Sequence, residues 1–459
     1  MSTHHVRTFP RQRLFVFLLL PMLCGFSLLL GLFTVPARNT PHAIGAFSAQ
    51  GRWIDWTGNA APTFASCEAA LQIPCYTPQL FRQAYDLTSL NSRGFTGKGQ
   101  TIVIIDSFGS PTAWSDLQQF DAGYGLPDPP SFQQLAPIGS VPFDPTNADQ
   151  RGWAAETSLD VQWSHAMAPD ASIVVLTSPV SETQGVQGMP EFLQLEQYAL
   201  DHHLGKIISQ SWGTTENTLF TPDGQQVFNG FEEFYRQAAF SGVSVFASAG
   251  DAGTGNPDVN GNIFPFPTVN YPAASPWVTA VGGTSLFTDA NGNYQHEMVW
   301  NDGVGSATGG GVSQQFHEPV YQALLPGSDQ HLLNGHRGLP DIAMNADPRT
   351  PVPVFLGFPG SRNGFHLFGG TSEGSPVWAG LTAVANQYVG HAVGFLNPAL
   401  YLLGFNQHEA ARVYHDITVG NNSQSPIPGF SATPGWDATT GWGTPIVQSL
   451  FQALKFGFI

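Results

Sequence analysis

The sequence predicts an α/β fold in which a mainly parallel sheet is flanked by helices on both faces. Apolar runs of strand length recur along the chain, and stretches with helical periodicity lie between several of them. Such alternation is typical of parallel sheets, whose strands are joined by helical crossovers. Residues 76–459 contain no repeat and no break in composition, so we expect them to form one domain.

The strands are predicted from five apolar runs, which are TIVII (101–105), SIVVL (172–176), KIISQS (206–211), VSVFAS (243–248) and WVTAV (277–281). Helical patterns lie between them at 153–166, 190–203 and 228–241. Several strands run directly into polar residues, including Asp106 and Asp251. Because sites in open parallel sheets gather at the carboxyl ends of strands, we look for functional residues there.

Residues 1–37 have the features of an export segment. The uncharged apolar run 14–35 follows three arginines, as in a signal peptide, and it is also long enough for one membrane span. Residues 35–37 offer small side chains for cleavage. A cleaved signal peptide and a retained membrane anchor therefore both stay open. In either case the arginines before the run place the body outside the cytoplasm, secreted or anchored to the outer face of a membrane.

Residues 38–75 show little periodicity, and we expect a linker there. Cys67 and Cys75 lie in this stretch. An oxidising compartment favours a disulfide between them, and two unpaired thiols are the alternative.

The chain is acidic, with 33 Asp and Glu against 16 Lys and Arg and a net charge of −17. Nucleic-acid-binding proteins usually carry a basic surface, so we expect no nucleic-acid partner. Protonation of carboxylates lowers the repulsion across an acidic surface, so the charge fits an acid environment. The 34 Phe and 11 Trp indicate a folded chain with a large core.

A candidate nucleophile lies in the glycine-rich turn 369–376, which opens a long apolar helix. Ser372 is placed there by a tight turn at a helix N-terminus, whose partial positive charge favours an alkoxide. The alternative is a simple helix cap. Residues 282–285 repeat the letters GGTS, but a strand end and a turn follow them, so we prefer Ser372 to Ser285.

The candidate general base is a pair of carboxylates. The 14 histidines include no His-Gly or His-x-His signature. Glu156 and Asp160 are four residues apart on a predicted helix and therefore project from one face. Two close carboxylates tend to share one proton, which raises one pKa. A solvated helix face is the alternative, although several neighbours such as Trp163 are apolar.

Asp251 stands at a strand end between glycines. It could be an ordinary turn residue. The functional interpretation is a carboxylic acid that stays protonated and donates a hydrogen bond to an oxyanion.

Taken together, these segments resemble the sedolisin family, the serine-carboxyl peptidases, from about Cys75 to the C-terminus. The matching blocks occur in family order and are Glu156-x-x-x-Asp160, SQSWG (209–213), SAGDAG (248–253), YPAASPWVTAVGGT (271–284), GGGVS (309–313), LPDI (339–342) and GTS (370–372). The resemblance implies a subtilisin-like fold and an acid-acting peptidase on protein or peptide substrates. We expect a monomer.

The resemblance also implies residue roles. Ser372 attacks the scissile carbonyl and Glu156 takes its proton. Asp160 orients Glu156 and shares a proton with it, and Asp251 replaces the oxyanion asparagine of subtilisins. Asp106 resembles the catalytic aspartate of subtilisins, but the family gives this position no catalytic role, so we leave it out.

One structural calcium site is also implied by the resemblance. Its ligand segments match Asp416, Ile417, Thr433, Gly435 and Asp437. Two carboxylates together with backbone carbonyls from the other three residues suit a hard cation.

The sequence departs from the family pattern at two places. Glu373 follows the nucleophile where the family usually has a small residue, and it adds negative charge there. Residues 38–75 are too short for the large prodomain that the family normally carries.

Two alternative functions stay open. An inactive binding or adhesion module on a sedolisin scaffold is disfavoured by the intact set of Glu156, Asp160, Asp251 and Ser372. A subtilisin-type peptidase of neutral pH is disfavoured because no His-Gly segment follows Asp106.

Overall fold

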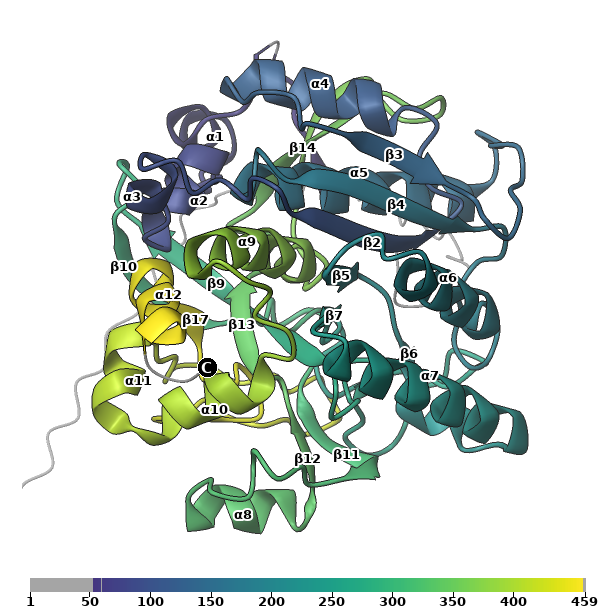
Figure 1. Cartoon of the computed structure of the whole chain (residues 1–459), viewed down its shortest axis with the longest axis vertical. Coiled ribbons are helices and arrows are strands. Elements are labelled where there is room, and N and C mark those ends of the chain that lie inside the picture. The colour runs from purple at the N-terminus through teal and green to yellow at the C-terminus, as the bar shows by residue number, and fades with distance from the viewer. Residues whose placement is uncertain (1–52, 59, 457–459) are drawn as a thin grey trace, which may run out of the picture. The chain divides into compact units, whose positions relative to one another are not determined.

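A computed structural model describes residues 53–58 and 60–456 (Figure 1). Its largest sheet has eight strands in the order β10-β9-β7-β5-β2-β4-β3, with β13 paired to β9. These strands are β2 (Thr101–Ser107), β3 (Phe132–Leu135), β4 (Ser172–Ser178), β5 (Ile207–Gln210), β7 (Ser244–Ser248), β9 (Thr279–Thr288), β10 (Tyr294–Val299) and β13 (Ile342–Asn345). Among the described strands of this sheet, β10 pairs antiparallel with β9, and all the other pairs are parallel. The predicted mainly parallel sheet is therefore confirmed.

Helices cover both faces of the sheet, and β2 shows how. Its alternate residues Ile102 and Ile104 belong to one hydrophobic cluster, and Val103 and Ile105 belong to another. One cluster includes α4 (Ala113–Tyr124), α5 (Ala148–Met167) and α9 (Gly374–Val389), and the other includes α6 (Met189–Asp201) and α7 (Pro222–Phe240). Figure 1 shows α9 against one face of these strands and α6 and α7 against the other. A strand buried on both faces reads as a continuous apolar run, which is why these strands could be predicted.

The helices that carry the site have clear local signals. Asn147 caps α5 by accepting hydrogen bonds from the backbone N–H groups of Asp149 and Gln150. Helix α9 ends at Gly390, whose φ of 99° lies in the left-handed region that favours glycine. The three predicted helices correspond to α5, α6 and α7, with observed bounds that extend or shift the predicted ones by a few residues.

The stretch expected to be a linker is folded from Trp53 onward. Strand β1 (Trp53–Asp55) pairs antiparallel with β15 (Gly364–Phe368), which also pairs with β14 (Val352–Leu356). Helix α1 (Phe64–Leu71) follows and contains Cys67, which forms the predicted disulfide with Cys75. A three-residue strand and a two-turn helix are too short to give a clear periodicity, so the sequence pattern missed them.

The predicted export segment, residues 1–37, lies outside the described residues. Among the helices that are described, none combines the length and the apolar character needed to cross a membrane.

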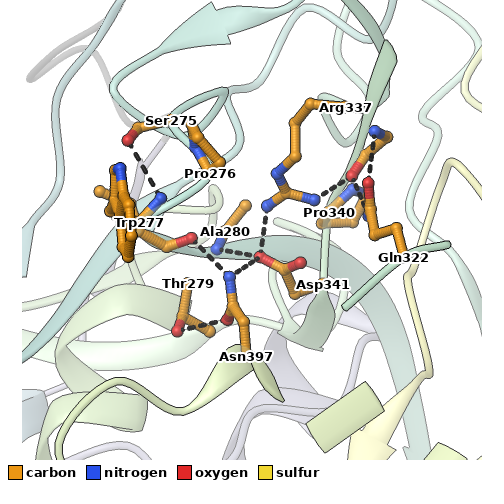
Figure 2. A network of polar contacts seen from close by, with 12 residues as sticks. Ser275, Pro276, Trp277, Thr279, Ala280, Gln322, Arg337, Pro340, Asp341 and Asn397 are labelled. Atoms are coloured by element: carbon orange, nitrogen blue, oxygen red, sulfur yellow. Dashed lines mark hydrogen bonds and ion pairs between the residues drawn. The ribbon is translucent and has the colours of Figure 1, made fainter. Parts of the chain in front are cut away.

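A buried ion pair lies beside β9 and is part of a network of polar contacts (Figure 2). Arg337 of β12 (His336–Leu339) donates to the carboxylate of Asp341 at 2.6 Å, and neither side chain is exposed. Asp341 also accepts hydrogen bonds from the backbone N–H of Ala280 in β9 at 2.8 Å and from the hydroxyl of Tyr401 in α10 (Asn397–Phe405) at 3.0 Å. Asn397 donates to the same carboxylate. One carboxylate thus connects β9, β12 and α10.

Replacing Asp341 with Asn should lower the free energy of unfolding by about 3–5 kcal/mol, because it leaves the Arg337 cation buried without a counter-charge. The measurement is urea unfolding followed by tryptophan fluorescence. Glu409→Gln is the matched control, since it removes the carboxylate of a partly exposed pair with Arg412 and should change stability little. Equal stability of the Asp341→Asn and Glu409→Gln variants would show that the buried pair does not carry this part of the fold.

Candidate active site

Ser372 lies in the turn between β15 and α9, and its side chain is almost buried, with 6% of its surface exposed. The turn is tight, because the backbone N–H of Glu373 donates to the carbonyl of Gly370 at 3.0 Å. Gly370 has a φ of 123°, and a Cβ atom there would lie 2.7 Å from a carboxylate oxygen of Asp251. Glycine is therefore required on both grounds.

The turn forms one wall of a small recess. The recess is lined by Trp212, Gly213, Ser248, Gly250, Asp251, Asn270, Thr371 and Ser372. Within the part of the chain that the structure describes, no histidine is among these lining residues.

Asp251 follows β7 and is held against the nucleophile turn. Its Oδ1 accepts hydrogen bonds from the backbone N–H and the hydroxyl of Thr371, both at 2.8 Å. The Thr371 hydroxyl in turn accepts from the backbone N–H of Gly250 at 2.9 Å. Because Oδ1 is already an acceptor twice, a proton on this carboxyl belongs on Oδ2, the oxygen that lies close to Gly370.

Glu156 and Asp160 are 1% and 0% exposed on α5, so they do not form a solvated helix face. The hydroxyl of Ser211, just after β5, lies 2.8 Å from Oδ1 of Asp160 and 3.2 Å from the backbone carbonyl oxygen of Ser372. Ser211 therefore links the carboxylate pair to the nucleophile turn. The sequence pattern placed Ser211 in a family block but gave it no role.

The hydroxyl of Ser211 lies between two acceptors. It donates to Oδ1 of Asp160 at 2.8 Å and makes a longer contact of 3.2 Å with the backbone carbonyl oxygen of Ser372. A serine hydroxyl has one proton to donate, so the two acceptors compete for it.

Electrostatics favours a neutral Asp160. The pKa of Asp160 is raised well above its usual range, first by burial and then by the negative charges of Asp106 and Glu156, which outweigh the hydrogen bond with Ser211. The pKa of Asp106 is raised to about 7, again by burial. Three buried carboxyls this close cannot all ionise. Asp106, which the family resemblance led us to leave out, therefore belongs to the same cluster as Glu156 and Asp160.

The competing serine, Ser285, has a different environment. It lies within β9, is 2% exposed, and donates a hydrogen bond to a carboxylate oxygen of Asp347 at 2.6 Å. That carboxylate also pairs with Arg349 at 2.8 Å. The Ser285 hydroxyl thus serves a structural carboxylate, and no helix N-terminus follows it.

The residues expected to bind calcium meet at one loop. Oδ2 of Asp416 accepts from the backbone N–H of Gly435 at 3.0 Å, and Oδ2 of Asp437 accepts from the N–H of Thr433 at 3.1 Å. Burial raises the pKa of Asp437 to about 6 despite hydrogen bonds to its carboxylate, and burial also raises the pKa of Asp416. Ile417 is buried next to Asp416. The set supplies only oxygen ligands, and Asp416 contacts the loop of residues 433–437 that carries Asp437, so these residues fit a hard cation.

Comparison with known proteins identifies the family. A model of the subtilase family matches residues 151–401. Kumamolisin from Bacillus sp. (strain MN-32) is 36% identical over 430 residues, which cover 92% of this chain and 69% of kumamolisin. Sedolisin from Pseudomonas sp. (strain 101) is 30% identical over 358 residues, which cover 76% of this chain and 56% of sedolisin.

A solved structure gives the same answer. The structure of Pseudomonas sedolisin, a serine-carboxyl proteinase, in complex with two molecules of pseudo-iodotyrostatin matches with a TM-score of 0.71 and 28% identity. The match covers 84% of this chain and all of that chain, so the expected subtilisin-like fold is confirmed. The chain belongs to the subtilase family and, within it, to the sedolisin-type serine peptidases.

Proposed function

We propose that this protein is an acid-acting peptidase that hydrolyses peptide bonds in protein or peptide substrates through an acyl-enzyme on Ser372. The observation that carries the proposal is the contact of Ser211 with both Asp160 and the carbonyl of Ser372, with Asp251 bonded to the neighbouring Thr371. This arrangement brings acids from α5 and from the end of β7 to one nucleophile turn.

In the proposed mechanism Glu156 is the general base. Asp160 holds the proton that the pair shares, so Glu156 is the member that stays ionised and accepts the proton of the Ser372 hydroxyl. The pair titrates as a unit, and its apparent pKa values belong to both residues. Burial strengthens the attraction between Glu156 and that proton, because the site contains little water to screen it.

Asp251 serves as the oxyanion donor. As a neutral acid it donates from Oδ2 to the negatively charged oxygen that develops when Ser372 attacks the scissile carbonyl. Two hydrogen bonds from Thr371 fix the orientation of this carboxyl before the reaction begins. Donors that are oriented in advance need no reorganisation in the transition state.

We also propose that the body works outside the cytoplasm as a monomer, either secreted or attached to a membrane through residues 14–35. The disulfide between Cys67 and Cys75 supports an oxidising compartment, because cytosolic thiols are normally kept reduced. Asp416, Ile417, Thr433, Gly435 and Asp437 are proposed to hold one calcium ion, which would cross-link the loop of residues 433–437 to the segment at Asp416.

Replacing Ser372 with Ala should lower kcat by a factor on the order of 10⁶, the scale of a lost catalytic serine in related chemistry. Peptide release from a denatured protein, measured from about pH 2 to about pH 8, checks this across the carboxyl titration range. Ser285→Ala is the matched control and should retain activity. If only the Ser285→Ala variant lost cleavage, Ser285 would be the nucleophile and the proposed role of Ser372 would be wrong. No cleavage by the wild type at any pH would favour a binding module.

Asp251→Asn tests the origin of the acid optimum. A neutral carboxyl donates only below its pKa, so wild-type kcat should fall as the pH rises and Asp251 ionises. An amide donates at every pH, so the variant should keep activity at higher pH than the wild type. Its maximal rate should stay above that of a variant without any donor, which loses about 10²–10³ in kcat. An unshifted alkaline limb in an active Asp251→Asn enzyme would assign the limb to another group.

Removal of calcium should lower the melting temperature. A ligand at about 100 times its Kd stabilises the folded state by roughly 2.7 kcal/mol, and this contribution disappears in strong chelator. Calorimetry with and without chelator, together with metal analysis of the purified protein, measures it. Without chelator, the Asp416→Asn variant should already melt at the lower temperature that the wild type shows in chelator. Adding chelator should not change the melting temperature of this variant. An unchanged melting temperature and no bound calcium would refute the site.

A further inference from the structure

Glu373, the residue after the nucleophile, is completely buried. An acid in the first turn of a helix usually lies in solvent, where it interacts with the helix dipole. Here the side chain points inward, and Oε1 accepts a hydrogen bond from the side-chain amide of Asn345 at 3.1 Å. Among the described residues, Oε2 has no hydrogen-bond partner. The carboxyl is therefore held on one side only.

Asn345, the last residue of β13, is itself rigidly held. Its Oδ1 accepts from the backbone N–H of Leu286 at 3.1 Å and from the hydroxyl of Thr350 at 2.7 Å. Its Nδ2 donates to the backbone carbonyl of Thr350 at 2.8 Å. Because the N–H of Leu286 can only donate, the oxygen of the amide faces it and the NH₂ group faces Glu373. Oε1 of Glu373 is thus an acceptor in a fixed geometry.

Among the residues that the structure describes, no cation balances this carboxyl. Burial raises the pKa of Glu373 well above its usual range. The hydrogen bond from Asn345 acts in the opposite direction but does not outweigh burial. Tyr85 interacts electrostatically with Glu373, and the Tyr85 hydroxyl donates to Glu297 at 2.8 Å. Tyr85 is neutral and Glu297 is an acid whose pKa is also raised by burial. The surroundings therefore favour the neutral form of Glu373.

We propose that Glu373, as a neutral carboxylic acid, is a positioning residue that ties the Ser372 turn to Asn345 of β13. The inference rests on the proposed role of Ser372. Glu373 acts through the backbone, because a shift of its Cα moves Ser372 with it. Ionisation of Glu373 would place a negative charge in the core with one carboxylate oxygen unpaired, which costs desolvation free energy. A movement of the Ser372 turn toward water would lower this cost. The charge also opposes the negative charge that develops at the reacting carbonyl.

The pH dependence of kcat distinguishes this positioning role from a purely structural role of a buried glutamate. The proposed mechanism already needs protons on Asp160 and Asp251, and a required proton on Glu373 adds one more. Above the pKa values of these groups, log kcat of the wild type should therefore fall with pH more steeply, by about one unit of slope, than that of an enzyme without this requirement. Glu373→Gln keeps an acceptor oxygen opposite Asn345 and cannot ionise, so its alkaline limb should be shallower than the wild-type limb by about one unit of slope. Glu373→Ala removes the hydrogen bond and should lower kcat about tenfold with KM little changed, in line with roughly 1.4 kcal/mol per factor of ten. Glu373→Gln should restore most of that kcat.

Glu196→Gln is the matched control. Glu196 is also a fully buried glutamate whose pKa burial raises well above the usual range, but it lies on α6, at the opposite face of the sheet. Its substitution should leave the slope of the alkaline limb as in the wild type. If Glu373→Gln fails to fold, the slope measured for Glu373→Ala decides the question, because alanine cannot ionise either.

Two results would overturn the inference, namely a Glu373→Gln limb that overlays the wild type in slope and midpoint, or a Glu373→Ala enzyme with wild-type kcat. Neither would affect the proposed function, which fails separately if the wild type cleaves nothing or Ser372→Ala stays fully active.

Discussion

The cost of burying a carboxyl group without a counter-charge governs both the fold and the site. Asp341 is balanced by Arg337, whereas Asp106, Glu216 and Glu373 are buried with no basic side chain paired to them among the described residues. Burial raises the pKa of Asp106 and of Glu216 to about 7. Because the unfolded values lie near 4, the stability that these acids contribute is complete below about pH 4 and is lost as the pH rises through about 7. The fold and the proposed chemistry therefore need protons in the same range.

The parallel sheet brings the acids together. Strands β2, β5 and β7 are neighbours and run in the same direction, so Asp106 near the end of β2 and the residues Ser211 and Asp251 after β5 and β7 lie at the carboxyl ends of the strands. Helices α5 and α9 pack against each other on one face of the sheet and supply the carboxylate pair and the nucleophile turn. Residues separated by more than two hundred positions in the chain thereby form one site, and none of them depends on a long flexible loop.

Much of this arrangement could be predicted from the sequence, because buried parallel strands appear as apolar runs and the polar residues at their ends stand out. The predicted site residues Asp160, Asp251 and Ser372 do lie in one region. The short β1 and α1 have too few residues for a periodic signal. Ser211 and Asp106 gain their importance only from neighbours that are distant in sequence, so no local pattern could reveal it.

Glu373 illustrates the limit of local rules most clearly. A helix N-terminus favours a negative charge by up to about 1 kcal/mol at an exposed position. Desolvation of a carboxylate costs several times that amount, so burial decides the charge state once tertiary packing turns the side chain inward. The partner then fixes what the acid can do. The charge of Arg337 opposes the burial that raises the pKa of Asp341, whereas Glu373 has only the neutral amide of Asn345 as a partner, which is compatible with a protonated carboxyl. The same side-chain chemistry thus provides a charge-paired contact at one place in this fold and a proton-dependent contact beside the nucleophile.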